Sequence, residues 1–303
     1  MKVFGIVVTY NGEKWIDKCF GSLSDSSVTL QILAIDNASS DNTVALIKSQ
    51  FPDVDVIETG SNLGFGKANN IGLKKALLEG ADYVFLLNQD AWVENTTLET
   101  LIEIARSNPE FGIISPVHLL PDKKKLEWHF SCYIGAEYCP GFVSDLYCNQ
   151  VKEIYELPVV NAAAWLINKT TLRLVGGFDP IFPHYGEDDD YCNRVGFKNL
   201  KIGVSPRAKI VHDITMKSWN EIKQNPTRQM IFNFIELKNL NSSYRYLKFN
   251  FVKTRLERLL TLIFTRRWKE LIFMTKIFFK TIVRFRLIAK SRKHSLEETS
   301  FLN

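Results

Sequence analysis

The chain has few cysteines, and their spacing fits no metal site. No two of them form the short Cys-x-x-Cys pair of a zinc finger or ribbon. In a chain with no sign of secretion they are expected to be free thiols. The five positions are Cys19, Cys132, Cys139, Cys148 and Cys192.

Long apolar runs are also missing. No stretch reaches the roughly 20 uninterrupted apolar residues of a transmembrane helix. Met1-Lys2 leads directly into a strand-length apolar run, with no small-residue cleavage site of a secretory signal after it. We therefore expect a cytoplasmic protein without a membrane-spanning helix.

The glycine-rich stretch Gly64-Phe65-Gly66-Lys67 lacks the features of two common nucleotide-binding motifs. Lys67 precedes Ala68, where a P-loop has Ser or Thr, and a dinucleotide fingerprint needs a third glycine directly after the first strand. Two explanations stay open. The stretch is a plain turn, or its glycines permit a close backbone approach while a helix N-terminus offers amides to an anion.

The first 107 residues do contain a regular alternation of apolar strand-length runs and helical patterns. This alternation predicts an α/β fold with a doubly wound, mostly parallel sheet. The carboxyl ends of such strands meet at one edge, where ligands bind. The expected strands cover residues 3–8, 30–35, 54–57 and 83–87, and polar loops rich in Asn and Asp follow most of them. From about residue 115 to 158 the pattern breaks down, which predicts an insertion along one wall of the crevice, and residues 159–167 predict another strand.

Four consecutive carboxylates, Glu187 to Asp190, stand at a predicted helix start. The helix dipole and an ion pair between Asp190 and Arg194, one turn on, account for one or two of them. The others are free to face the crevice. A carboxylate beside other carboxylates has a raised proton affinity, which suits a general base.

Asp90 and His212 both stand at predicted strand ends. Each has a plain alternative, because Asp90 is also placed to flank a helix beginning near Asn95 and a lone histidine is usually structural. If both face the crevice, a carboxylate, an imidazole and diphosphate oxygens form a site for Mg²⁺ or Mn²⁺.

Taken in order, these motifs resemble glycosyltransferase family 2, and most closely its rhamnosyltransferase-like members in bacterial surface polysaccharide synthesis. The resemblance covers roughly residues 3–215. The motifs that carry it are Thr9-Tyr10-Asn11, Asp36-Asn37-Ala38-Ser39-Ser40-Asp41, Asn62-Leu63-Gly64-Phe65-Gly66, Asn88-Gln89-Asp90, Gly176-Gly177-Phe178-Asp179, Glu187-Asp188 with Asp190 and Arg194, and His212.

The resemblance implies a GT-A fold and an inverting transfer of a hexose or deoxyhexose, rhamnose among them, from a nucleotide-diphosphate sugar to a glycan or lipid-linked glycan. UDP and dTDP donors are favoured, because Asp36 would accept from a pyrimidine imide. The donor site it implies consists of Thr9, Tyr10, Asn11, Asp36, Asn62, Gly64, Phe65, Asn69 and Asn88.

The resemblance also implies the reacting groups. Asp188 matches the catalytic base. Asp90 stands at the last position of the metal-binding Asp-x-Asp motif, and His212 where the family often adds a metal ligand. The acceptor side it implies contains Trp165, Glu187 and Asp190.

Two departures from the family pattern matter. Asn88 replaces the first Asp of the metal motif, which removes a negative charge and predicts a lower metal affinity. Processive members carry Gln-x-x-Arg-Trp, whereas this chain has Phe264 before Arg267-Trp268. We therefore expect transfer of a single sugar.

The charge of the chain is divided unevenly. Residues 245–293 hold fifteen Lys and Arg and two Glu, which leaves residues 1–244 slightly acidic. We expect a GT-A domain at 1–225, with a nucleotide half at 1–110 and an acceptor half at 111–225, and a helical region at 226–303. Its basic amphipathic pattern favours the cytoplasmic face of an anionic membrane. Packing on the protein's own body is the alternative, and no nucleic-acid partner is indicated.

Two rival functions stay open. A non-catalytic sugar-nucleotide-binding or scaffold subunit of a glycan assembly complex would explain the Asn88 departure. A nucleotidyltransferase would need a glycine-rich basic loop after the first strand, and residues 9–12 do not supply one.

Overall fold

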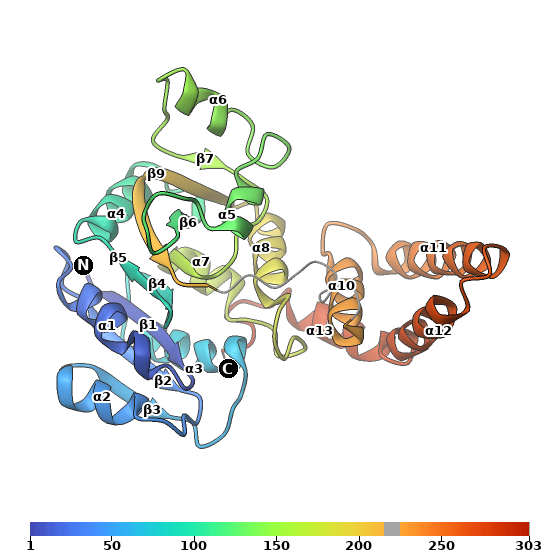
Figure 1. The fold of residues 1–303 in the computed structure, drawn as a ribbon, viewed down its shortest axis with the longest axis horizontal. Coiled ribbons are helices and arrows are strands. Elements are labelled where there is room, and N and C mark those ends of the chain that lie inside the picture. Colours follow the sequence, from blue (N-terminus) through green and yellow to red (C-terminus); the bar gives the residue numbers. More distant parts are fainter. Residues whose placement is uncertain (215–224, 303) are drawn as a thin grey trace.

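The computed structural model describes residues 1–214 and 225–302. In this part of the chain nine strands form one twisted sheet in the order β3-β2-β1-β4-β8-β6-β9-β5, with β7 added beside β9 (Figure 1). The strands are β1 Val3–Thr9, β2 Gln31–Asp36, β3 Asp55–Glu58, β4 Tyr83–Asn88, β5 Ala91–Val93, β6 Phe111–Leu119, β7 Tyr155–Glu156, β8 Ala164–Asn168 and β9 Lys201–His212.

The expected doubly wound, mostly parallel sheet is confirmed. β1 to β4 are mutually parallel, and β6 and β9 continue in the same direction beyond β8, which runs antiparallel between β4 and β6. The expectation that regular structure ends near residue 115 was wrong. β6 continues through Pro116, because the sheet absorbs this proline at a register irregularity between Pro116 and Val117.

Helices cover both faces of the sheet because side chains alternate along each strand. Along β1, Phe4 and Ile6 join the core beneath α3, α7 and α8, whereas Val3 and Val7 join the core beneath α1 and α4. The helices of this body are α1 Ile16–Ser24, preceded by the 3-10 turn Glu13–Trp15, α2 Thr43–Gln50, α3 Phe65–Leu78, α4 Thr97–Ser107, α5 Trp128–Tyr133, α6 Phe142–Tyr147, α7 Lys169–Val175 and α8 Glu187–Phe197.

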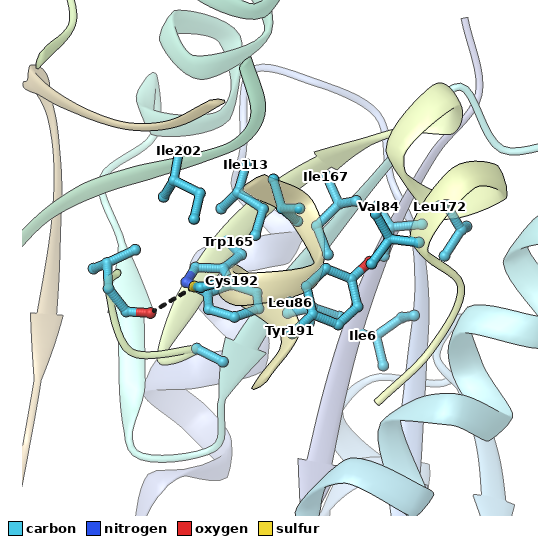
Figure 2. Close-up of a cluster of buried hydrophobic side chains, with 14 of the residues drawn as sticks. Ile6, Val84, Leu86, Ile113, Trp165, Ile167, Leu172, Tyr191, Cys192 and Ile202 are labelled. Atoms are coloured by element: carbon cyan, nitrogen blue, oxygen red, sulfur yellow. Dashed lines mark hydrogen bonds between the residues drawn. The ribbon is translucent and has the colours of Figure 1, made fainter. Parts of the chain in front are cut away.

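Trp165 lies at the centre of the first of these cores (Figure 2). Its indole stacks on Phe178 with ring centroids 6.0 Å apart and contacts Tyr191 at 5.6 Å. The Cys192 thiol donates to the Val160 carbonyl at 3.7 Å, the dashed line in the figure. These contacts fix α8 against the sheet, and with it the acidic first turn of that helix.

Four further helices form an arm beside the sheet. They are α10 Pro226–Lys238, α11 Tyr244–Phe264, α12 Trp268–Ile282 and α13 Phe285–His294. Their apolar faces meet in a separate cluster that includes Phe234, Phe251 and Phe278. In Figure 1, α11 and α12 lie furthest from the sheet, and the segment after α13 returns to the body near α3. Among the described residues, no helix combines the length and the hydropathy that crossing a bilayer requires.

Candidate active site

Buried polar atoms without hydrogen-bond partners gather at one edge of the sheet. This edge is formed by the carboxyl ends of β4, β6 and β9, the residues leading into β8, and the start of α8. Within residues 1–214 and 225–302, seven buried side-chain nitrogen or oxygen atoms lack a partner. They belong to Asn88, His118, Asn161, Trp165, Glu187 and His212. Unpaired buried polar atoms are rare and mark places where a ligand or ion supplies the missing contact.

The neighbouring ends of β1 and β2 are fully hydrogen-bonded. The Thr9 hydroxyl donates to Asp36 Oδ1 at 2.9 Å, and the Ser39 backbone N–H donates to Asp36 Oδ2 at 2.9 Å. The Ser39 hydroxyl donates to the same carboxylate. Asp36 is 2 % exposed, so these three donors replace its water and hold it in one orientation.

Asn11 and Tyr10 belong to the loop that follows β1. Asn11 adopts a left-handed backbone conformation with φ 47°, and its side-chain oxygen accepts from the Ser40 N–H at 2.8 Å. Tyr10 exchanges two backbone hydrogen bonds with the Gln89 side chain, at 2.8 and 3.1 Å. Sequence reasoning had not singled out Gln89, which joins this loop to the end of β4.

The loop from Asn62 to the start of α3 approaches the loop before α8. Gly64 has φ +81°, and a Cβ atom there would lie 2.2 Å from the Pro183 carbonyl oxygen. Glycine is therefore required, as the close-approach explanation predicted. Phe65 meets Phe178 edge to face at 5.8 Å, and the buried Asn69 side chain donates to the Phe65 carbonyl.

Asp90 and His212 lie together, as the two strand ends predicted. His212 Nε2 is 3.4 Å from Asp90 Oδ1, and the Asp213 N–H donates to the Asp90 carbonyl at 2.8 Å. The imidazole is 2 % exposed, and neither of its nitrogens has a hydrogen-bond partner. Asn88, two residues before Asp90, also has a buried side-chain oxygen without a partner. A carboxylate, an imidazole and an amide oxygen in this position fit a divalent cation.

Two further buried groups, His118 of β6 and Glu127 at the N-cap of α5, stand close to His212. Burial lowers the pKa of His118 to about 3, so the imidazole is neutral at pH 7. Burial opposes ionisation of Glu127, but hydrogen bonds from His129 and Phe130 outweigh it and lower the pKa to about 2. Sequence reasoning missed both residues, because nothing in the spacing of 118, 127 and 212 indicates that they meet.

The acidic first turn of α8 reaches the same sheet edge, since the backbone at Ala162, just before β8, hydrogen-bonds to the Asp188 carboxylate. Asp188 is half-buried and accepts from the Asp189 N–H at 3.0 Å. Burial raises the pKa of Asp188, and burial together with the Asp188 charge raises the pKa of Glu187 to about 8 and that of Asp189 to about 7. The Arg228 guanidinium, a neighbour that the sequence did not indicate, opposes the increase at Glu187 and Asp188.

Two residues expected on the acceptor side are placed in the interior. Trp165 is fully buried in the core of Figure 2. Asp190 is 3 % exposed and pairs with Arg194 at 2.9 Å, as the helical spacing predicted, and with Lys238 at 3.3 Å. The Asp190 carboxylate is occupied by these two ion pairs, whereas Glu187 keeps a buried carboxylate oxygen without a partner.

Comparison with known proteins agrees with this fold. Residues 6–154 match the sequence model described as Glycosyl transferase family 2, so the chain carries a glycosyltransferase family 2 domain. This match, together with the relatives described next, identifies a glycosyltransferase that uses a nucleotide sugar.

Among characterised relatives, the chain is similar to rhamnosyltransferases. It is 25 % identical over 236 residues to the N-acetylglucosaminyl-diphospho-decaprenol L-rhamnosyltransferase of Mycobacterium tuberculosis, covering 68 % of this chain and 74 % of the relative. It is 24 % identical over 221 residues to the dTDP-rhamnosyl transferase RfbF of Shigella flexneri, covering 71 % and 70 %.

Solved structures confirm the GT-A fold. The mannosyltransferase PcManGT from Pyrobaculum calidifontis, in complex with GDP-Man and Mn²⁺, superposes with a TM-score of 0.59 at 14 % identity, over 93 % of this chain and 87 % of that one. TarS of S. aureus in complex with UDP superposes with a TM-score of 0.55 at 17 % identity, over 82 % and 68 %.

Proposed function

We propose that this chain transfers one sugar, with rhamnose favoured, from a UDP- or dTDP-sugar to a hydroxyl of a glycan or lipid-linked glycan, with inversion at the anomeric carbon. The observation that carries the proposal is that two sets of groups meet the same sheet edge. His212 lies 3.4 Å from Asp90, and the Asp188 carboxylate is hydrogen-bonded by the backbone at Ala162, next to Ala163, whose carbonyl accepts from the Asn88 N–H at the end of β4. The relatives support the sugar and the acceptor class, since one is named for dTDP-rhamnose and another for a decaprenol-linked acceptor.

Asp188 is the proposed general base. Its carboxylate is held by the Asp189 N–H and by the backbone at Ala162, which leads into β8. Burial raises its pKa, which brings its proton affinity closer to that of an effective base at neutral pH. Asp188 would take the proton from the acceptor hydroxyl as the oxygen attacks the anomeric carbon. A single displacement from the face opposite the leaving diphosphate inverts the configuration.

The donor is proposed to bind along the ends of β1, β2 and β4. Asp36, with Thr9 and Asn11 around it, would accept the imide N–H of uracil or thymine. Tyr10, Asn62, Gly64, Phe65 and Asn69 line the approach to the diphosphate position, and Asn88 lies beside it. Asp90 and His212 would hold Mg²⁺ or Mn²⁺, which supplies positive charge to the leaving diphosphate when it is bound.

The test is release of nucleoside diphosphate by the purified chain from a panel of UDP-, dTDP- and GDP-sugars with a lipid-linked acceptor, in Mn²⁺ or in EDTA. We expect metal-dependent release from one pyrimidine donor that Asp188→Asn abolishes. Asp189→Asn, one residue away in the same acidic turn, is the matched control and should retain most activity. Equal glycan assembly by wild type and Asp188→Asn would instead support a scaffold.

We further propose that residues 1–225 form the catalytic unit and that residues 226–303 place it on an anionic membrane. Several large apolar side chains of α11 and α12 are exposed, with Phe264 at 83 % and Ile272 at 58 %. Basic residues share these helices, and a mixed apolar and basic surface binds acidic lipids. Sedimentation with vesicles containing phosphatidylglycerol should be lost in Phe264→Glu/Trp268→Glu and retained in Tyr147→Glu, an equally exposed aromatic on α6.

A further inference from the structure

Three buried side chains from distant parts of the sequence meet, and one of them, His212, lies 3.4 Å from Asp90. His118 lies at the end of β6, His212 at the end of the neighbouring strand β9, and Glu127 at the N-cap of α5. One nitrogen or oxygen atom from each lies within 4.8 Å of the corresponding atom of the other two. Atoms that share one metal ion at bond lengths of roughly 2.0 to 2.2 Å lie about 3 to 4 Å apart, so small movements of these side chains would bring all three atoms onto one ion.

The hydrogen bonds around His118 determine which ring nitrogen is free. The Ser115 hydroxyl donates its proton to the Pro116 carbonyl at 3.0 Å. With its hydrogen on the Pro116 carbonyl, the hydroxyl oxygen accepts from His118 Nε2, which lies 3.1 Å away. With its proton on Nε2, the imidazole carries a lone pair on Nδ1, and Nδ1 is buried without a partner. This is the arrangement of a metal-binding histidine whose other nitrogen is oriented by a second group.

His212 and Glu127 add further acceptors to the same place. The two imidazoles meet edge to face with centroids 6.1 Å apart, and both nitrogens of His212 lack hydrogen-bond partners. Glu127 is fully buried and accepts from the backbone N–H groups of His129 and Phe130 at 2.8 and 2.9 Å, so its carboxylate is fixed in position. The unpartnered ring nitrogens of the two imidazoles are costly to bury unless another group or a cation binds them.

We propose that His118, Glu127 and His212 together bind a divalent transition-metal ion, with Asp90 on its solvent side. Two imidazoles and one carboxylate favour Mn²⁺, Co²⁺ or Zn²⁺ over Mg²⁺, which prefers oxygen ligands. The proposal rests on the proposed function in one respect, because it takes Asp90 and His212 as residues that bind the cation of the donor site. His118 of β6 and Glu127 at the start of α5 would take the place of the carboxylate ligand that Asn88 does not supply. The alternative is that His118 is only a packing residue. That explains its stacking on Phe130, with ring centroids 4.6 Å apart, but supplies no hydrogen-bond donor for the unpartnered ring nitrogens.

The test is metal binding by the full chain without any sugar donor. After removal of metal with EDTA, Co²⁺ is titrated and followed by calorimetry and by its visible absorption, which reports nitrogen ligation. We expect about one Co²⁺ per chain in the wild type, and a loss of affinity of roughly 100-fold or more in His118→Phe and in Glu127→Gln. Glu127→Gln retains an oxygen that caps α5, and His118→Phe retains the stack on Phe130, so melting temperatures in EDTA should change little.

His294→Gln is the matched control, because His294 pairs with Glu297 at 2.7 Å on the exposed side of α13 and should bind no metal. Unchanged Co²⁺ affinity and spectrum in both site variants would overturn the ligand set, while donor turnover that depends on Asp90 would leave the proposed function standing. The opposite outcome is also distinguishable. If Co²⁺ binding requires His118 and Glu127 but the chain consumes no sugar donor, the metal site is supported and the transferase function is contradicted.

Discussion

The two halves of the sheet edge differ in how their polar groups are satisfied. On the proposed nucleotide side, formed by Thr9, Asn11 and Asp36, the side chains bond to one another and to backbone. On the reaction side, which includes His118, Glu187 and His212, buried atoms have no partner. The first half is organised before a ligand arrives, whereas the second keeps hydrogen-bonding capacity for a cation and a reacting group.

Buried ion pairs, rather than contacts among its own loops, stabilise the reaction side. Lys238 of α10 pairs with Asp179 and Asp190, and Arg194 pairs with Asp190 and donates to the carbonyls of Val175 and Gly177 at 2.7 Å. These ion pairs are buried. The helical arm thus stabilises the acidic turn of α8, although it contributes little to the nucleotide side.

The largest expected effect is on catalysis. Asp188→Asn should lower the rate of sugar transfer by roughly 100- to 10,000-fold, the usual contribution of a general base. Affinity for the nucleoside diphosphate, measured by calorimetry, should stay within about threefold of the wild type, because the nucleotide side is organised independently. Equal losses of rate and nucleotide affinity would mean that the two sides are not independent.

The next effect is on stability. Lys238→Met leaves Asp179 and Asp190 buried without this cation, and breaking a buried pair costs about 3–5 kcal/mol. Urea denaturation should show this loss, whereas Lys276→Met, at an exposed position of the same arm, should cost less than about 0.5 kcal/mol. If both variants unfold at the wild-type midpoint, the arm does not stabilise α8.

A pH series separates the two sides further. The pKa of Glu187 in the folded protein is raised to about 8. Protonated Glu187 therefore makes its full contribution to the free energy of unfolding below its unfolded-state pKa, and this contribution is lost as the pH rises through the folded-state pKa of about 8. Glu187→Gln removes that loss. The free energy of unfolding of the variant should therefore exceed that of the wild type by a margin that grows between pH 5 and pH 8, to on the order of a few kcal/mol. A constant margin would contradict a protonated Glu187.

The smallest effect is expected on the nucleotide side. Thr9→Val keeps the β-branched shape of this buried strand residue and removes one of three donors to Asp36. We expect a loss of about 1–2 kcal/mol in the free energy of unfolding. Nucleotide affinity should fall less than tenfold, since Ser39 still holds the carboxylate. A loss as large as that of Lys238→Met would show that the pocket depends on this single bond.

Local patterns in the sequence predicted much of this molecule. The first four strands, the pair Asp190 with Arg194, the close approach at Gly64 and the meeting of Asp90 with His212 all follow from periodicity, helical spacing or the direction of parallel strands. Each of these depends on residues near in sequence or on a general property of α/β sheets.

What the sequence did not predict depends on long-range register. β8 inserts antiparallel between β4 and β6, and no local pattern determines that order. Pro116 and Ser115 have the composition of a loop but lie in a buried strand. Glu127 reaches His118 because α5 starts directly after a bridge between Leu119 and Leu126, a contact that is decided only when the sheet is complete.

The contacts of Asn70 bear on the order in which parts of the chain fold. Its side chain donates to the carbonyls of Phe178 and Phe301 and accepts from the Phe178 N–H, joining segments 108 and 231 residues apart in sequence. Contacts that close such long loops form late, because the chain must lose the most entropy before they are made. The docking of residues 299–302 on Gly177 should therefore be among the last steps, so the carboxylates of α8 reach their final surroundings only when folding is nearly finished.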